Sequence, residues 1–85
     1  MSFSPSKGDQ IPRPDRATLH QILLDHRRFV TNQPGGRRAL LASHDLSDQD
    51  MSGSNLTEAD LTGAVMHRTL LSGAVLRKAT LYGAD

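Results

Sequence analysis

The side chains that could carry out chemistry are spread through the sequence without a common spacing. Serine and aspartate are frequent, and the four histidines are His20, His26, His44 and His67. His20 and His26 are six residues apart, so they would not lie on one helix face as a metal-binding pair must. His44 and His67 have no partner at the spacing of a catalytic pair. We therefore predict no catalytic residues, no metal site and a non-enzymatic protein.

Other common sites and locations are also disfavoured. The pair Gly35 and Gly36 lacks the longer motif and the preceding strand of a phosphate-binding loop, so we expect no cofactor. There is no cysteine, which excludes disulfides and is compatible with the cytoplasm. No apolar run is long enough to span a membrane or to form the core of a signal peptide. We expect a cytoplasmic protein.

The second half of the chain is organised by a large aliphatic residue that returns every five positions. A step of five would scatter these residues around an α-helix, and it would send successive ones to opposite faces of a strand. If the chain turns a corner once per unit, all nine can face inward. This predicts a solenoid with a core ladder of nine residues: Leu41, Leu46, Met51, Leu56, Leu61, Met66, Leu71, Leu76 and Leu81.

The other positions of the unit are also patterned. A small residue usually stands two positions before the large one, and a short acid or amide often directly precedes it, as in SNLTE from Ser54 and ADLTG from Ala59. From Ala39 to Asp85 this resembles the A(D/N)LXX signature of the pentapeptide repeat family. The resemblance implies a right-handed quadrilateral β-helix with four units per coil. The expected fold class is β, with about two coils and an N-terminal α-helical cap.

The coil implied by the resemblance stacks residues that are 20 positions apart. It would place Asp48 beneath Arg68 and Glu58 beneath Lys78, two pairs of opposite charge that played no part in choosing the register. Each exposed pair would contribute only about 0 to 1 kcal/mol to stability, so the leucine ladder must hold the fold.

Three segments are predicted. Residues 1–14 contain three prolines and few apolar side chains, and we expect a disordered tail. The alternative is a docking peptide anchored by Phe3 and Ile11. Residues 15–33 are predicted to form an amphipathic helix that begins at Asp15 or Thr18. Residues 34–85 hold the repeats. The apolar face of the helix is formed by Leu19, Ile22, Leu23, His26, Phe29 and Val30.

The apolar face of the predicted helix is large enough to cover the core at the first coil. A solenoid exposes its core at the first coil unless something covers it, so we assign the helix as the N-terminal cap. The alternative is that its apolar face binds a partner. The first coil departs from the pattern at His44, Gln49 and Ser54, where the helix end or the loop at Gly35 and Gly36 would have to supply hydrogen bonds.

Two surfaces are candidates for interaction. The C-terminal end of the ladder has no cap in the sequence, and such an edge invites another copy or another protein. An apolar band is expected on the outside of the second coil, and exposed apolar area often marks an interface. The alternative is that these residues simply suit extended backbone. The band consists of Val65, Leu70, Val75 and Tyr82.

The function expected from the sequence is that of a protein-interaction or scaffold module. We expect it to be the N-terminal part of a larger bacterial protein or a subunit of an assembly. The alternative is a DNA-mimicking inhibitor or protector of a topoisomerase such as gyrase, as some members of the family are. Mimicry calls for a long acidic stack, whereas the net charge here is +1. Scattered bases and one tyrosine do not favour nucleic-acid binding. A third class is the accessory domain of an enzyme.

Overall fold

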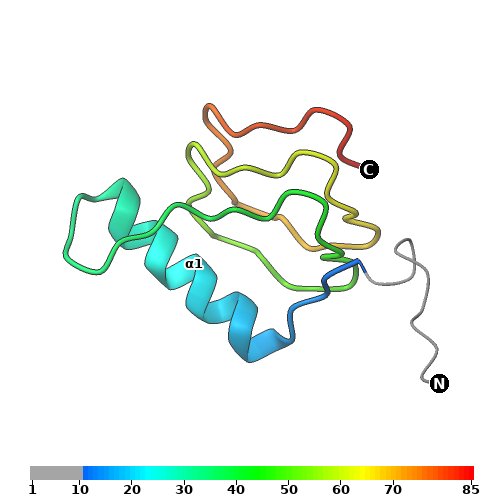
Figure 1. Ribbon diagram of the computed structural model, residues 1–85, viewed down its shortest axis with the longest axis horizontal. Coiled ribbons are helices and arrows are strands. Elements are labelled where there is room, and N and C mark those ends of the chain that lie inside the picture. Colours follow the sequence, from blue (N-terminus) through cyan, green and yellow to red (C-terminus); the bar gives the residue numbers. More distant parts are fainter. Residues whose placement is uncertain (1–10) are drawn as a thin grey trace, which may run out of the picture.

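A computed structural model describes residues 11–85, which form one α-helix followed by a chain that winds upward in circuits (Figure 1). The helix, α1, spans Arg16–Val30. From Leu40 onward the chain returns over itself after 20 residues, which is four units of five. Five isolated parallel bridges show this offset: Leu40–Asp60, Asp45–Val65, Asp50–Leu70, Asn55–Val75 and Asp60–Thr80.

The predicted β-helix fold class is wrong for this structure. Residues 39–85 form no β-strand and no sheet; each bridge is isolated, and α1 is the regular element of the described chain. The reason lies in the unit itself. A tight turn follows every large aliphatic residue, so the backbone is extended for too short a distance to form a ladder between neighbouring circuits.

The turn has the same geometry in every unit. The N–H of the third residue after the large one donates to the carbonyl of the large one, as in Ala64 to Leu61 at 3.0 Å. The residue before that donor has a positive φ, for example +68° at Gly63 and +67° at Glu58. An i to i+3 bond with a positive φ at the third residue is the geometry of a type II turn. Each unit therefore turns one corner of the circuit.

Successive circuits are joined by backbone hydrogen bonds despite the absence of strands. The N–H of a large residue donates upward, as in Leu61 to the carbonyl of Thr80 at 2.8 Å. The N–H of the preceding residue donates downward, as in Asp60 to the carbonyl of Ala39 at 3.0 Å. A third bond leaves the turn, from Gly63 to Tyr82 at 2.9 Å. These bonds satisfy the backbone at the places where a sheet would have done so.

The core is the ladder of large residues, and its burial declines along the chain. The first five members have no exposed surface, while Met66, Leu71 and Leu76 are partly buried against them. Leu81 is 41% exposed. The ladder thus points inward as expected, and its covering runs out at the last circuit. The fully buried members are Leu41, Leu46, Met51, Leu56 and Leu61.

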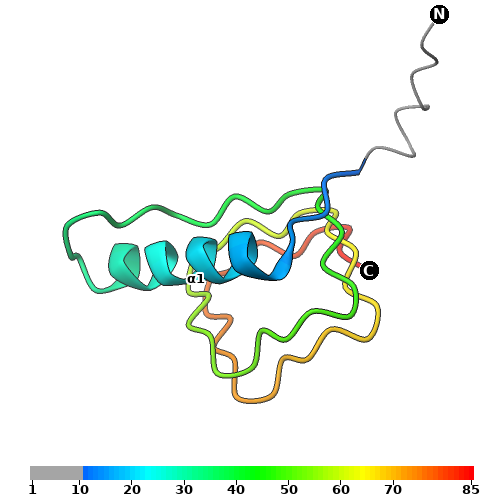
Figure 2. The same cartoon turned by 90° about the horizontal axis from the view of Figure 1, so that it is seen from below.

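Asp15 directly precedes α1, and its carboxylate accepts the N–H of Thr18 at 2.7 Å. Asp15 is therefore the N-cap, rather than Thr18. Leu19 is buried, and Ile22 and Leu23 pack against the core cluster. Viewed from below, α1 crosses the underside of the first circuit (Figure 2). The helix covers that end of the core.

His26 joins α1 to the repeats from a fully buried position. Its Nδ1 accepts the N–H of Ala39 at 2.8 Å, and its Nε2 lies 2.7 Å from the carbonyl oxygen of Thr57. Because an acceptor at Nδ1 carries no proton, Nε2 must be the nitrogen that donates to Thr57. His26 therefore has a structural role as the link between α1 and the repeats.

The tail predicted over residues 1–14 lies mostly outside the described residues, together with its proposed anchor Phe3. Its last part contacts the first circuit, since the N–H of Asp45 donates to the carbonyl of Pro12 at 2.8 Å. Ile11 is 43% exposed. The described helix is too short and too polar to cross a membrane.

Candidate interaction surface

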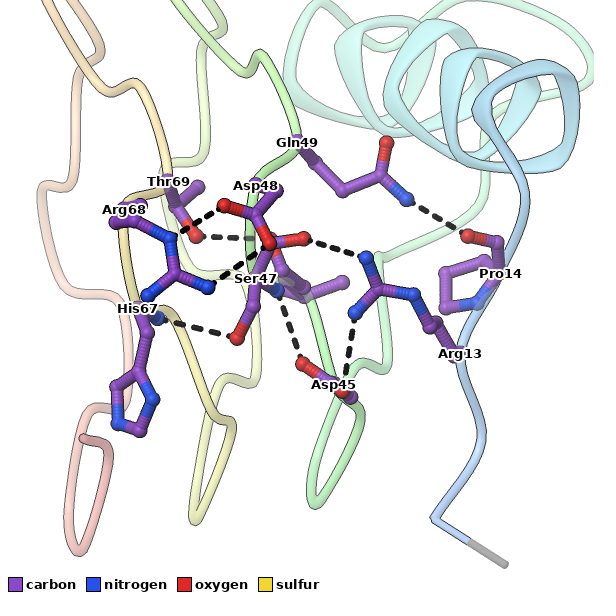
Figure 3. A network of polar contacts seen from close by, with 10 residues as sticks. Arg13, Pro14, Asp45, Ser47, Asp48, Gln49, His67, Arg68 and Thr69 are labelled. Atoms are coloured by element: carbon purple, nitrogen blue, oxygen red, sulfur yellow. Dashed lines mark hydrogen bonds and ion pairs between the residues drawn. The ribbon is translucent and has the colours of Figure 1, made fainter.

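A polar network connects the segment before α1 to the second unit of the first circuit (Figure 3). The Arg13 guanidinium donates to the carbonyl of Ser47 at 2.9 Å and pairs with the Asp45 carboxylate at 3.0 Å. Gln49 donates from its side chain to the carbonyl of Pro14 at 2.8 Å. The large polar residue Gln49 thus finds its partner in this segment, and not in the helix end or the glycine loop.

The other two irregular positions of the first circuit are also accommodated. His44 Nδ1 lies 2.9 Å from the carbonyl oxygen of Ala42, two residues earlier. Ser54 is half-buried. All buried side-chain nitrogen and oxygen atoms in the described part of the chain have hydrogen-bond partners. The irregular positions of the first circuit are therefore accommodated without an unsatisfied buried side-chain atom in the described part of the chain.

One of the two predicted charge pairs is formed. Arg68 donates twice to Asp48, at 2.7 and 3.1 Å, and this hydrogen bonding lowers the pKa of the Asp48 carboxyl and raises that of Arg68. Between Glu58 and Lys78 the described structure has no ion pair. Instead, the backbone carbonyl of Glu58 accepts a hydrogen bond from Arg38. The register is confirmed at Asp48 and Arg68.

The residue before each large one has a different role in the two circuits. In the first circuit it is an acid or amide that accepts the N–H two positions later, as Asp60 accepts from Thr62 at 3.1 Å. Hydrogen bonding from Thr62 lowers the pKa of the Asp60 carboxyl. In the second circuit the same positions hold Val65, Leu70, Val75 and Thr80. Val65, Leu70 and Val75 have no side-chain acceptor for this bond and place aliphatic groups here, whereas Thr80 keeps a hydroxyl.

The predicted apolar band is distributed around the circuit. Val65 is half-buried, while Leu70 and Val75 are 56% and 40% exposed. These three belong to successive units, and each unit turns a corner, so they face different sides. Tyr82 is 84% exposed in the turn of a fourth unit. A partner that touched all four would have to wrap around the coil.

The upper edge is formed by Leu71, Leu76 and Leu81 of the last circuit. The N–H groups at the six preceding ladder positions all donate to the circuit above them, at 2.7 or 2.8 Å. The N–H groups of Leu71, Leu76 and Leu81 have no backbone acceptor among residues 11–85. This edge combines unpaired donors with partly exposed core side chains, and Figure 1 shows the last part of the chain, in orange to red, at the top of the coil.

The residues that could do chemistry remain apart. His67 pairs with Asp85 at 2.8 Å, and both side chains are more than half exposed. In the described part of the chain, no three His, Asp or Glu side chains gather to hold a metal ion. The sequence reasoning missed the linking role of His26. A histidine on the apolar face of a predicted helix was the available signal.

The repeats also match a known protein family. The pentapeptide repeats match in eight copies, over residues 37–68 and 54–85. Together these ranges cover residues 37–85, which is 49 of the 85 residues. No curated protein and no solved structure matches the chain. With a match over more than half of its length and a twenty-residue circuit of four units, the chain belongs to the pentapeptide repeat family.

Proposed function

We propose that this chain is a non-enzymatic protein-interaction module that binds through its upper edge. The observation that carries this proposal is the set of unpaired N–H groups at Leu71, Leu76 and Leu81. Extended backbone from another copy or another protein could supply the matching carbonyls. The exposed part of Leu81 would be covered at the same time, which adds an apolar contribution to the contact.

Light scattering over a range of protein concentrations tests association between copies. We expect the mass to rise with concentration, and the variant Leu81→Asp to remain monomeric because it places a charge in the contact. The control is Ser72→Asp, which adds the same charge at an exposed position of the last circuit. Association that is unchanged in Leu81→Asp would contradict a role for this edge.

If wild-type protein stays monomeric, binding of a different protein is tested by native mass spectrometry of the module isolated from its own cells. A complex with wild type that is absent with Leu81→Asp would support the proposal. A mass equal to that of the free chain would reject it.

The alternative of DNA mimicry receives less support from the charge distribution. The first circuit, residues 41–60, carries five acids and no Lys or Arg, whereas residues 61–80 carry Arg68, Arg77 and Lys78 and no acid. The acidic surface is therefore interrupted after one circuit. In a gyrase supercoiling assay we expect no change in activity when the protein is added, and inhibition would favour mimicry.

A further inference from the structure

Two backbone donors on the underside of the first circuit have no acceptor among residues 11–85. They are the N–H groups of Asp50 and Asn55, which occupy the position directly before a ladder residue. At every other such position from Asp45 to Asp85, the N–H donates to the layer below at 2.8 to 3.0 Å. Because the geometry repeats from unit to unit, these two N–H groups also point downward. We call this pair the lower edge.

The lower edge opens into a hollow of about 550 Å³ between α1 and the first circuit. Leu23, Leu24 and Arg27 line its helix wall, and Asp50 and Asn55 lie on the circuit wall. In Figure 2 the ribbon of α1 crosses one part of the underside and lies to the side of the segment around residues 50–55. The cap is therefore incomplete at the unpaired donors.

The neighbouring unit shows how such an edge is filled. There the segment 12–14 runs beneath residues 45–49 in the same direction as the circuit. The carbonyl of Pro12 accepts from the N–H of Asp45, and Arg13 donates to the carbonyl of Ser47. Beyond Pro14 the chain turns into α1, and the next positions along the circuit, Asp50 and Asn55, line the hollow. Extended backbone is the ligand that matches this geometry.

The hollow has a positive charge on its helix wall, at Arg27, and a negative charge on its circuit wall, at Asp50. Asp50 is the carboxylate in its lining, and its Oδ1 already accepts the N–H of Ser52 at 3.0 Å. That hydrogen bond and, to a smaller extent, the charge of Arg16 lower the pKa of the Asp50 carboxyl. Arg27 has no ion-pair partner among residues 11–85, so its guanidinium is available to pair with a carboxylate of a ligand. Leu23 and Leu24 provide apolar surface next to it.

We propose that this hollow binds an extended segment of another protein that carries aliphatic and acidic side chains. Carbonyl groups of the segment accept from Asp50 and Asn55, an aliphatic side chain packs on Leu23 and Leu24, and a carboxylate pairs with Arg27. This proposal adds a second contact to the interaction function above, at the opposite end of the molecule. It does not depend on the upper edge.

Amide hydrogen exchange of the full chain, measured by NMR, tests the proposal. The probe is a blocked peptide of alternating valine and glutamate, and the matched probe has lysine in place of glutamate. The glutamate peptide should slow exchange at Asp50 and Asn55 and leave Asp45, which is already bonded, unchanged. Binding should weaken at least tenfold in Leu24→Asp, and Arg27→Glu should reverse the preference toward the lysine peptide.

The control variant is Arg77→Glu, which makes the same charge change on the second circuit and should leave the peptide affinity unchanged. Leu81→Asp, which changes the upper edge, should also bind the glutamate peptide with the affinity of the wild type. The proposal for the upper edge and the proposal for the hollow can therefore be rejected independently. The proposal is overturned if neither peptide slows exchange at Asp50 and Asn55, or if the wild type prefers the lysine peptide.

Two other occupants are separate outcomes, and each would also overturn the proposal. Protection of Asp50 and Asn55 that grows with protein concentration in the absence of peptide would place a second copy in the hollow. Protection that is independent of concentration and is lost on deletion of residues 1–10 would place the chain's own N-terminal segment there.

Discussion

At the scale of single residues, the turn position with a positive φ destabilises some repeat units more than others. Gly53, Gly63, Gly73 and Gly83 occupy this position in some units, whereas Asp48, Glu58, Arg68 and Lys78 occupy it in others. A residue with a β-carbon costs roughly 1 to 2 kcal/mol in the left-handed region, whereas glycine does not. The side chains in the second group are therefore placed against the preference of their backbone.

The substitution Glu58→Gly should raise the free energy of unfolding by about 1 kcal/mol, because Glu58 has a φ of +67° and no side-chain hydrogen bond or ion pair in the described structure. The matched change Gly73→Ala, at a φ of +73°, should lower it by a similar amount. Urea denaturation of both variants measures the effect. A loss of stability in Glu58→Gly would show that its side chain makes a contribution larger than the backbone cost.

The carboxyl groups before the ladder residues make stability depend on pH. The hydroxyl and the N–H of Thr62 both donate to the Asp60 carboxylate, and these hydrogen bonds lower the pKa of that carboxyl. A carboxyl whose pKa is lower in the folded state stabilises the protein above its unfolded pKa, near 3.9. This contribution is lost as the pH falls through the folded pKa. Asn55 makes the same contacts to Thr57 without titrating.

The variant Asp60→Asn should therefore lose less stability than wild type when the pH is lowered from neutral to about 3. The amide oxygen can accept the same two hydrogen bonds but cannot be protonated in this range. Thermal unfolding at a series of pH values measures the difference in slope. Parallel curves for the two proteins would show that Asp60 does not contribute to the acid sensitivity.

At the scale of the elements, His26 connects the cap and the first circuit through two hydrogen bonds to backbone groups. One of these groups, the N–H of Ala39, belongs to a residue that is 1% exposed. The variant His26→Phe fills the space but leaves the N–H and the Thr57 carbonyl unpaired. Unsatisfied buried groups cost about 1 to 3 kcal/mol each, so we expect a loss in this range or above it.

Chemical denaturation of His26→Phe checks this expectation against His20→Phe, the same change at an exposed position of α1. The control should stay within about 0.5 kcal/mol of wild type. Equal stability of the two variants would mean that water replaces both bonds of His26 at little cost.

The core ladder predicts a gradient along the coil. Leu61 is fully buried, and Leu61→Ala should cost about 2 to 5 kcal/mol. Leu81 is 41% exposed, so Leu81→Ala should cost clearly less. The change Thr62→Ala, at a half-buried position where it also removes a hydrogen bond, provides a polar comparison. Thermal melting measures both variants. If Leu61→Ala lowers the melting temperature no more than Thr62→Ala does, the buried ladder is not the main source of stability.

At the scale of the whole molecule, stability should grow with each complete circuit, because a circuit covers the one beneath it. The last described circuit is incompletely covered, with Met66, Leu71 and Leu76 only partly buried. Inserting a second copy of residues 61–80 after Thr80 should raise the melting temperature by burying these side chains and pairing the N–H groups of the original upper edge. The matched control insert carries serine in place of the ladder residues and should not raise it.

Much of the internal arrangement was predicted from the sequence. The helix, the inward side of the ladder and the pair of Asp48 with Arg68 all depend on patterns that recur along the chain, and they were found where expected. The missing pair of Glu58 and Lys78 shows the limit of this reasoning. The period of the repeat places Glu58 and Lys78 in one column, but it does not determine which contacts they make. Arg38, which lies in a loop that the period does not describe, donates to the backbone carbonyl of Glu58.

The sequence by itself determined which side chains face inward and where the chain turns, because both are local properties of a five-residue unit. Only the tertiary structure decided that single bridges join the circuits in place of strands, and that His26 and the segment 12–14 attach the cap. It also decided that the underside stays open at Asp50 and Asn55. These features depend on hydrogen bonds between distant segments, whose geometry is not encoded in any one unit.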